Sequence, residues 1–381
     1  MTISVPENTP VWDDHAWTRL PALDGDVRAD VCVVGLGGSG LTAVGELLRR
    51  GASVVGIDGG MVAAGAAGRN GGFLLAGTYD FYHDAVERHG RERARRIYGL
   101  TVDEIRRIAG EAPDAVRLTG SVRLADSDEE LEDCRRQSEA MRADDLPVQA
   151  YAGPEGQGLL IPTDGAFNPL LRCRILARRA VDGGARLFEH APALDVRPGE
   201  VRTPAGTVRC DRVVVAVDGR LEALLPELEG RVRTARLQML ATAPTDEVRV
   251  PRPVYARWGY DYWQQLPDGR IAAGGFRDAG GEDEWTREAL PGDTVQARLE
   301  AFLRERIGVR APVTHRWAGC VGYTPTGLPV LEEVRAGVWA TGGYSGTGNV
   351  IGALCGRAAA ELALDGASAL GDVFRSDGRA G

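Results

Sequence analysis

The chain has 381 residues, with 45 basic and 54 acidic side chains, and carries a formal net charge of −9. It contains no lysine, so all 45 basic side chains are arginines. A Schiff-base lysine, a pyridoxal-phosphate anchor and a P-loop are excluded, because each requires a lysine and arginine does not deprotonate near neutral pH. The acidic balance disfavours nucleic acid or an anionic membrane as a partner.

The six cysteines are scattered without a C-x-x-C pair, and the five histidines lack an H-x-x-x-H pair. We therefore expect neither a disulfide framework nor a metal site, and a reducing cytoplasm fits this pattern. The sequence has no stretch of 18 apolar residues and begins with a polar, acidic segment. This predicts neither a signal peptide nor a membrane anchor.

The first strong element is ADVCVVGLGGSGLTAVGELLRRGASVVGID, residues 29–58. A β-branched run meets a glycine turn, apolar residues then recur at helical spacing, and a second β-branched run follows Gly51. The pattern predicts a strand, a helix and a second strand that ends at Asp58, which is a βαβ unit with short connections.

The turn of this unit reads Gly35-x-Gly37-x-x-Gly40, with Gly38 and Ser39 between the last two glycines. Such glycines permit a tight turn, let a pyrophosphate approach the backbone and allow close packing of the helix on the strand. The free N–H groups of the helix then face the phosphates, and Asp58 is placed to accept hydrogen bonds from ribose hydroxyls. The alternative, an ordinary glycine-rich turn, explains neither the flanking strands nor the acid.

The second strand opens into a glycine- and alanine-rich loop over 59–78, where an NAD-dependent dehydrogenase would normally begin another helix. A second glycine loop, GGYSGTG, precedes the last predicted helix. Two glycine loops far apart in the sequence suit one long ligand that is held from both ends of the chain. Between them we expect helices, strands and turns in the following order: a helix over 81–109, a helix over 168–183, strands over 187–219 with a turn at Ala205-Gly206, strands over 231–280 with a hairpin at Asp268-Gly269, and a helix over 294–307.

Several segments together resemble one family. ADVCVVGLGGSG, GAAGRNGGF, RVVVAVDG, LPDGRIAAGG, RWAGCVGYTPTGLPVL and GGYSGTGNVIGALCGRAAAEL are similar to the D-amino-acid-oxidase-type FAD-dependent oxidoreductases. Within that superfamily, the G-R-N-G-G loop is most similar to γ-glutamylputrescine oxidase-like amine oxidoreductases. The sequence departs from the family at GAAG, where GASG is common, and at VAVDG, where ATG is common.

The resemblance implies an α/β fold, mixed with α+β features. It implies a Rossmann-like FAD-binding domain assembled from three segments (1–78, 160–230 and 313–381) and a substrate domain built on a largely antiparallel sheet (79–159 and 231–312). It also implies that the loop after Asp58 passes along the flavin ring. The residues expected to bind FAD are Gly35, Gly37, Gly38, Ser39, Gly40, Asp58, Gly68, Arg69, Asn70, Gly71, Gly72, Ala193, Ala216, Gly219, Gly343, Gly346, Thr347, Gly348 and Asn349.

Candidate substrate contacts lie in the segment RWGYDYWQ, residues 257–264. Strand alternation would place Tyr260, Tyr262 and Gln264 on one face, and Trp263 is a further candidate contact. Aromatic side chains above a flavin form a cage for an amine, or they simply pack within a sheet. We predict that Arg69, Asn70, Tyr260 and Tyr262 take part in catalysis. Similar sequences carry a basic residue where Gln264 stands, which disfavours a substrate with a carboxylate.

Two further hypotheses concern single positions. Cys320, in WAGCVGYTP, lies near the position at which sarcosine-oxidase-like relatives attach FAD covalently, and the alternative is a packed thiol. Tyr79, Tyr82 and His83 either line the substrate pocket or pack in the core or on the surface.

The sequence thus predicts FAD-dependent oxidation of a C–N bond in a small amine or amino acid, followed by hydrolysis of the imine. The alternatives are an NAD-dependent dehydrogenase and a flavin-binding protein without turnover. Dioxygen or another acceptor takes the electrons. Because relatives use a lysine near the flavin to help dioxygen react, and this chain has none, we expect slow peroxide formation relative to dye reduction. Nothing in the sequence indicates the oligomeric state.

Overall fold

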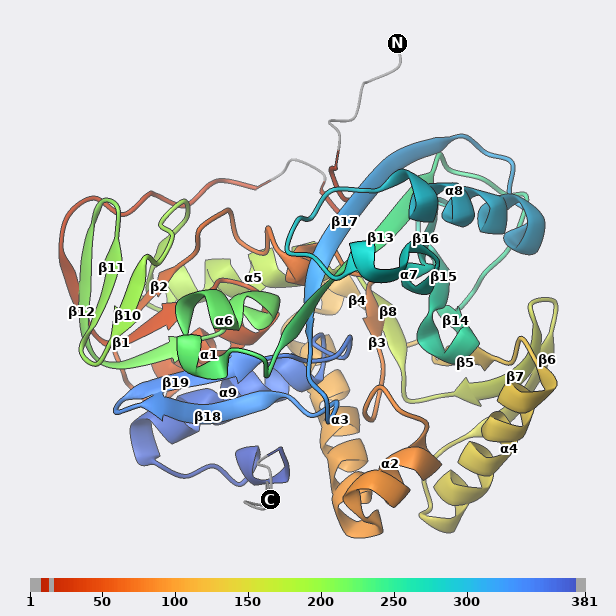
Figure 1. Cartoon of the computed structure of the whole chain (residues 1–381), viewed down its shortest axis with the longest axis horizontal. Helices are drawn as coiled ribbons and strands as arrows, with labels where there is room; N and C mark the ends of the chain where they lie inside the picture. The colour runs from red at the N-terminus through yellow and green to blue at the C-terminus, as the bar shows by residue number, and fades with distance from the viewer. Residues whose placement is uncertain (1–7, 14–16, 375–381) are drawn as a thin grey trace. The chain divides into compact units, whose positions relative to one another are not determined.

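The computed structural model of the chain describes residues 8–13 and 17–374 (Figure 1). The chain divides into two compact units. Unit 1 comprises Met1–Asp14, Arg69–Asn168 and Ala235–Cys320, and unit 2 comprises His15–Gly68, Pro169–Thr234 and Val321–Gly381. The segments of unit 2 differ from those predicted for the FAD domain. The first ends at residue 68 and not at 78, the second runs over 169–234 and not over 160–230, and the third begins at 321 and not at 313. Residues 8–13 of the N-terminal arm belong to unit 1, whereas the sequence assigned them to the FAD domain; the arm from residue 17 onward belongs to unit 2.

Unit 2 is built on a sheet whose central strands are parallel and in which the pairs β10–β11, β11–β12 and β18–β19 are antiparallel. Its order is β10-β11-β12-β1-β2-β9, and β19 pairs with β12 and with β18. The pairs of β1 with β12 and β2, of β2 with β9 and of β12 with β19 are parallel. The bounds are β1 Val27–Val34, β2 Val54–Ile57, β9 Arg186–Phe188, β10 Asp195–Arg197, β11 Glu200–Thr203, β12 Gly206–Val215, β18 Val330–Arg335 and β19 Val338–Gly342.

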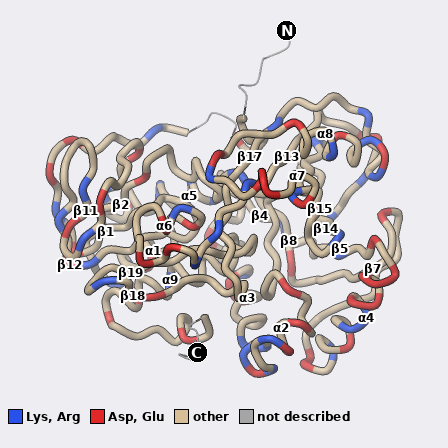
Figure 2. Tube along the Cα trace, in the orientation of Figure 1, with Lys and Arg blue, Asp and Glu red and all other residues tan. Residues whose placement is uncertain are grey.

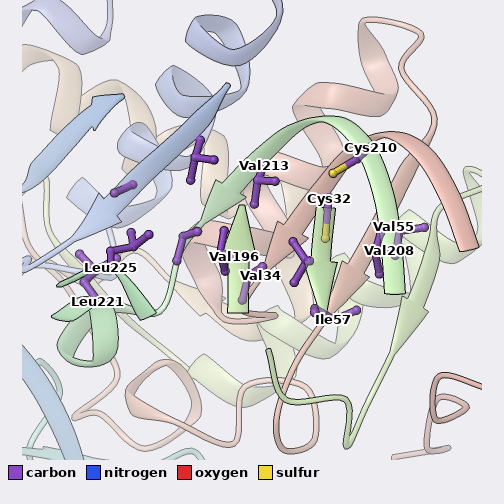
Figure 3. Close-up of a cluster of buried hydrophobic side chains, with 14 of the residues drawn as sticks. Cys32, Val34, Val55, Ile57, Val196, Val208, Cys210, Val213, Leu221 and Leu225 are labelled. Atoms are coloured by element: carbon purple, nitrogen blue, oxygen red, sulfur yellow. The ribbon is translucent and has the colours of Figure 1, made fainter. Parts of the chain in front are cut away.

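The core of unit 2 lies on this sheet, and Figure 3 shows side chains of several strands gathered there. Cys32 of β1 stands opposite Val213 of β12, and Val34 opposite Val215, and all four are buried. The β-branched run is buried along its whole length, as expected for a parallel sheet that is covered on both faces. Helix α1 packs against α5 and α9. The helices are α1 Gly38–Arg49, α5 Pro169–Asp182, α6 Leu221–Leu224 and α9 Ile351–Asp365.

Unit 1 is built on an eight-stranded sheet of order β17-β13-β16-β15-β14-β5-β7-β6 and on a small antiparallel sheet of order β3-β8-β4. Among the registers of the large sheet, the pair of β14 with β5 is parallel, and those of β13–β16, β14–β15, β15–β16, β5–β7 and β6–β7 are antiparallel. The strands are β3 Phe73–Leu74, β4 Val116–Arg117, β5 Ser121–Leu124, β6 Gln149–Gly153, β7 Gly156–Ile161, β8 Gly165–Phe167, β13 Arg233–Thr242, β14 Val254–Ala256, β15 Asp261–Gln265, β16 Ile271–Gly275 and β17 Val313–Tyr323.

The helices of unit 1 correct one prediction. The helix expected over 81–109 is two helices, because Gly90 adopts a φ of 81° between them and ends the first. Figure 2 shows charges of both signs along α4, which fits a solvated face. The helices are α2 Tyr82–His89, α3 Arg91–Glu111, α4 Asp128–Ala143, α7 Arg277–Gly280 and α8 Asp293–Phe302, which continues as a π-helical turn over Leu303–Ile307.

Several local predictions are confirmed. The helix expected over 168–183 is α5, and the strand, glycine loop and helix expected at the C-terminus are β19, residues 343–350 and α9. The turn at Ala205-Gly206 joins β11 to β12, which pair in an antiparallel register. Asp268 and Gly269 lie in the hairpin between β15 and β16. Each of these signals is local, since turn residues and apolar spacing act over a few positions.

Candidate FAD site and substrate-side residues

The predicted dinucleotide turn lies in unit 2, between β1 and α1. A Cβ atom added to Gly40 would lie 1.9 Å from the carbonyl oxygen of Gly35, so only glycine permits this packing of the helix on the turn. Helix α1 begins at Gly38, and its N-cap, Gly37, provides no side-chain hydrogen bond. The first N–H groups of a helix lack intrahelical partners, and without a side-chain cap they form a binding site for an anion.

Asp58 directly follows β2, and its carboxylate reaches this turn. Its Oδ2 accepts a hydrogen bond from the N–H of Leu36 at 2.7 Å, and its Oδ1 accepts one from the N–H of Gly60 at 2.8 Å. Burial raises the pKa of Asp58, and these two N–H groups oppose the rise. Each carboxylate oxygen has a second lone pair, so Asp58 holds the glycine turn in shape and keeps acceptors for ribose hydroxyls.

The C-terminal glycine loop is organised by Asp218, which the sequence analysis did not select. Its Oδ1 accepts hydrogen bonds from the N–H groups of Gly343 at 2.9 Å and Tyr344 at 3.2 Å, and its Oδ2 accepts one from Gly322 at 3.1 Å. Burial raises the pKa of Asp218, and the N–H groups oppose the rise. The signal in the sequence was the departure VAVDG, which places this acid where the family commonly has ATG.

The fingerprint and the C-terminal loop meet within unit 2. The hydroxyl of Tyr344 donates a hydrogen bond to Ser39 Oγ at 2.8 Å, and both side chains are buried. The N–H of Thr347 donates to the carbonyl oxygen of Tyr344 at 2.9 Å, which closes a turn before α9. Around this turn, Gly346 has a φ of 88°, and Gly348 and Asn349 are half-buried.

The other residues assigned to FAD in unit 2 occupy three places. Ala216 is buried at the end of β12, where its carbonyl oxygen approaches Gly35. Gly219 accepts a hydrogen bond from the hydroxyl of Thr234. Ala193 is half-buried before β10, and Gly68 closes the loop after β2 through its N–H bond to Ala63. The N–H donors of the uncapped helix and of the two adjoining glycine loops, together with the acceptor oxygens of Asp58, fit FAD.

The remaining residues of the predicted flavin loop, Arg69 to Gly72, belong to unit 1. The Nε of Arg69 donates to the carbonyl oxygen of Ala318 at 2.5 Å, and its Nη2 donates to that of Asn8 at 2.5 Å. The indole of Trp317 donates to the carbonyl oxygen of Arg69 at 2.8 Å. Burial lowers the pKa of Arg69. The guanidinium therefore anchors the start of the loop to two backbone carbonyls.

Asn70 shapes the same loop. Its Oδ1 accepts a hydrogen bond from the N–H of Gly72 at 2.8 Å, and its carbonyl oxygen accepts one from the indole of Trp12 at 2.9 Å. These contacts assign Arg69 and Asn70 a part in holding the loop. A direct part in catalysis, as the sequence predicted, stays a prediction.

Gln264 supports this loop from β15, and the sequence did not reveal this arrangement. It is 1% exposed, and its Nε2 donates to the carbonyl oxygens of Gly71 at 2.6 Å and Gly72 at 3.1 Å. Its Oε1 accepts a hydrogen bond from Arg117 at 3.1 Å. Burial lowers the pKa of Arg117. All hydrogen-bonding groups of the amide are thus directed at the protein, so Gln264 is a positioning residue for the loop.

The neighbours of Gln264 separate into three environments. Tyr262 lies on the same face, and two of its ring carbons would lie 3.0 Å and 3.1 Å from a Cβ atom added to Gly71. Trp263 points to the opposite face, where it is 3% exposed and packs edge-to-face on Phe302 in the core. Strand alternation thus turns Trp263, a candidate substrate contact, into the core. Tyr260 precedes β15 and is 37% exposed, so the expected shared face holds for Tyr262 and Gln264 and not for Tyr260.

A polar cavity lies inside unit 1 between α2, α3 and the large sheet. Its volume is about 20 Å³, which is room for about one water molecule. Arg123 of β5 lies between the rings of Phe81 and Tyr255, at 4.2 Å and 4.8 Å from their centroids. Four buried polar atoms of its lining have no hydrogen-bond partner in the described part of the chain: Thr78 Oγ1, Asp80 Oδ2, Tyr98 OH and Arg123 Nε.

Asp164 lies at the wall of this cavity and is 1% exposed. Its oxygens accept hydrogen bonds from Ser121 Oγ at 2.6 Å and from the N–H of Ala76 at 2.9 Å. Burial raises the pKa of Asp164 to about 7. The cavity therefore contains a carboxyl group that titrates near neutral pH beside an arginine that stays charged.

The hypotheses on four other side chains have different outcomes. Tyr82 lines the cavity, but its hydroxyl donates to Asp144 at 2.8 Å. Tyr79 is 42% exposed, and His83 is not part of the cavity lining. Cys320 is half-buried in β17, whereas the other five cysteines are buried. Its partial exposure keeps the covalent link to the flavin as a hypothesis.

Within residues 8–13 and 17–374, no three His, Cys, Asp or Glu side chains are grouped so as to hold a metal ion. In the same described ranges, no helix has both the length and the apolar character needed to cross a membrane.

Comparison with known proteins identifies the class. Residues 30–362 match the model of the DAO family, FAD dependent oxidoreductase, and the chain belongs to this family. It is 29% identical to the probable oxidoreductase OrdL of Rhizobium meliloti (strain 1021), with 93% of this chain and 90% of OrdL covered. It is 27% identical to the gamma-glutamylputrescine oxidoreductase of Escherichia coli (strain K12), with 91% and 86% covered.

Among solved structures, glycine oxidase from Geobacillus kaustophilus has the same fold, with a TM-score of 0.72 and 22% identity over 90% of this chain and 96% of that one. The predicted fold class, the family and the FAD cofactor are confirmed. The protein is an FAD-dependent oxidoreductase.

Proposed function

We propose that this protein oxidises a C–N bond of a small amine or amino acid, and that the resulting imine is hydrolysed. The observation that carries the proposal is the G-R-N-G-G loop, which is held by Gln264 and Arg69 and lies against the ring of Tyr262. Family membership and the similarity to gamma-glutamylputrescine oxidoreductase support the amine as substrate. Unit 2 then holds the dinucleotide part of the cofactor, and unit 1 provides the G-R-N-G-G loop and the substrate contacts.

When bound, FAD supplies a two-electron acceptor for the hydride of the substrate's α-carbon. The protein binds the amine as the neutral base, orients it with Tyr262 and keeps the loop backbone fixed through Gln264. An amine that binds unprotonated needs no catalytic base, which agrees with the absence of lysine. Water attacks the imine carbon, and the products are a carbonyl compound and ammonia or a smaller amine.

We further propose that the far end of the substrate is a carboxylate and that it binds at the wall of the polar cavity, displacing the single water for which the cavity has room. Tyr255, which lines the cavity, stands directly opposite Tyr262 in the register of β14 and β15. Side chains of such a pair share one face of the sheet. Arg123 Nε and Tyr98 OH are donors without partners among the described residues, and donors of this kind recognise a carboxylate. Arg123 thus provides a cation for the carboxylate, in place of the basic residue that similar sequences carry where Gln264 stands.

The electrons leave to dioxygen or to another acceptor, and we propose another acceptor. No lysine is available to supply a fixed positive charge near the flavin. Arg69, the arginine of the flavin loop, is bound to the carbonyls of Ala318 and Asn8. We also propose that the protein works in the reducing cytoplasm, as its scattered cysteines suggest.

The decisive experiment is anaerobic reduction of the purified yellow protein across a panel of amines. The panel pairs each amino acid with the amine that lacks its carboxylate. Bleaching of the visible flavin bands by some members supports the proposal. A protein that no member bleaches, but that dithionite reduces, is a flavin-binding protein without turnover.

The variant Arg123→Met tests the carboxylate site. We expect KM to rise about 10-fold or more for amino acids and to change little for the matched amines, since a charged hydrogen bond contributes about 1.5–3 kcal/mol. The control is Arg136→Met. Arg136 is an exposed residue of α4 that forms an ion pair with Asp133. Equal changes in KM for the amino acid and for its matched amine would contradict the assignment of Arg123 to a substrate carboxylate.

A further inference from the structure

A buried arginine lies against the helix that begins the fingerprint. Arg172 is on α5, which packs against α1, and is 2% exposed. Such complete burial of an arginine requires an explanation, because charged side chains are almost never fully buried unless they are paired. Both helices belong to unit 2.

The contacts place the guanidinium on the first turn of α1. Its Nη1 lies 3.1 Å from the position of a Cβ atom added to Gly38, the first residue of the helix. Its Nη2 donates to Thr42 Oγ1 at 3.3 Å, and that hydroxyl in turn donates to the carbonyl oxygen of Gly38 at 2.7 Å. Its Nε is buried and has no hydrogen-bond partner in the described part of the chain.

Among the residues that the structure describes, no acidic side chain compensates this charge. Across residues 8–13 and 17–374, Arg172 forms no ion pair, and a hydroxyl is its hydrogen-bond acceptor. Removing an ion from water costs several kcal/mol even after the protein relaxes, and a hydroxyl acceptor offsets little of this. The chain therefore keeps an uncompensated cation beside the helix N-terminus that lacks a side-chain cap.

We propose that the diphosphate of FAD is the counter-ion of Arg172. The N–H groups at the start of α1 attract the same anion, because the N-terminus of a helix carries a partial positive charge. Arg172 adds a full charge and donors on the first turn of that helix. Its role is binding of the cofactor, and it is independent of which substrate the enzyme oxidises.

An Arg172 that binds the diphosphate and an Arg172 that serves only as packing have different effects on the stability of the apoprotein. With FAD bound, Arg172 is paired and stabilises the complex. Without FAD, its charge is buried and unpaired, so it destabilises the apoprotein. Removing the charge should therefore raise the stability of the apoprotein and lower that of the holoprotein. An arginine that serves only as packing would lower both when it is replaced.

The test compares Arg172→Met with Arg178→Met, which removes an exposed arginine from the same helix and so changes the net charge equally. Both variants and the parent carry Cys320→Ala, so that the flavin is removed without cleaving a covalent link. Apoproteins are titrated calorimetrically with FAD, ADP and adenosine at 50 mM and 500 mM salt. Melting temperatures are measured with and without FAD.

For Arg172→Met we expect FAD and ADP to bind 10- to 100-fold more weakly at low salt, and adenosine, which lacks the diphosphate, to bind as before. The loss of ADP affinity between low and high salt should be smaller than in the parent, because one charged contact is gone. The apoprotein should melt at a higher temperature than the parent, and the holoprotein at a lower one. Arg178→Met, which removes a cation–π contact with Trp17, should match the parent in its affinities for FAD, ADP and adenosine and should not stabilise the apoprotein.

Unchanged ADP affinity, or an apoprotein of Arg172→Met that melts lower or does not fold, would overturn the proposal. The variant Arg172→Lys keeps the charge on a shorter group without the planar fork. It should give an ADP affinity between those of the parent and Arg172→Met, and any other order also counts against the proposal. Since these measurements use no amine, their outcome does not depend on the proposed oxidation.

Discussion

The replacement of Gln264 by leucine tests whether the G-R-N-G-G loop lies at the flavin. Leucine has nearly the shape of glutamine but no hydrogen-bonding groups. It removes the donors to the carbonyls of Gly71 and Gly72 and the acceptor for Arg117. If this loop passes along the flavin ring, the substitution should change the flavin environment as well as the stability.

The expected loss of stability depends on which hydrogen bonds the partners of Gln264 retain in the variant. The carbonyl oxygen of Gly72 still accepts the N–H of Phe167 at 2.9 Å, and Arg117 still donates to the carbonyl oxygen of Gln265 at 3.1 Å. The carbonyl of Gly71 loses its 2.6 Å bond to the buried amide. An unsatisfied buried group costs about 1–3 kcal/mol, so the full loss at one group and partial losses at two suggest about 2–4 kcal/mol. For a folding unit of this size, that is roughly 5–15 °C in Tm.

The matched control is Gln265→Leu, one position along β15 and on the other face of the strand. The Nε2 of Gln265 donates to the carbonyls of Thr245 and Val248, each at 3.2 Å, and its Oε1 accepts the N–H of Val250 at 3.0 Å. Both substitutions should lower Tm by similar amounts. Only Gln264→Leu should shift the visible flavin bands and slow the anaerobic reduction by amines.

The assays are thermal unfolding of the holoprotein, its absorption spectrum and stopped-flow reduction. A variant Gln264→Leu with an unaltered flavin spectrum and an unaltered reduction rate would refute the assignment of the loop to the flavin. Equal spectral changes in both variants would refute the specific role of Gln264.

Three more predictions concern other groups. Because burial raises the pKa of Asp164 to about 7, the folded state binds a proton that the unfolded state has released above pH 4, and stability falls between about pH 4 and pH 7. The decrease is at most about 4 kcal/mol, and Asp164→Asn should remove it from the profile of Tm against pH; parallel profiles would contradict this. Dye reduction should exceed peroxide formation because the chain lacks lysine, and fast, stoichiometric peroxide release with amine would count against the reasoning. If Cys320 carries the flavin, acid precipitation should leave the yellow colour in the pellet, and Cys320→Ala should release it; colour wholly in the supernatant of the unsubstituted protein ends that hypothesis.

The sequence by itself determined those features whose signals lie close together along the chain. The glycine spacing and Asp58 predicted the turn between β1 and α1, because backbone clearance at Gly40 depends on residues five positions away. The β-branched run predicted a buried strand, and the turns at Ala205 and Asp268 predicted hairpins. The broken helix at Gly90 was missed, since a single glycine within a periodic pattern does not show which φ it adopts.

Tertiary structure alone decided which distant groups meet and with what charge. Whether Gln264 faces a substrate or a backbone loop depends on a partner some 190 positions away, and no periodicity reports such a contact. The same holds for Asp218, which orders a loop about 125 positions further on, and for Trp263, whose face is set by the register of β15. In the sequence, Arg172 is one of four arginines in the segment that forms α5. Only the packing of α5 on α1 shows that its charge is buried, because burial is a property of the assembled fold and not of the local sequence.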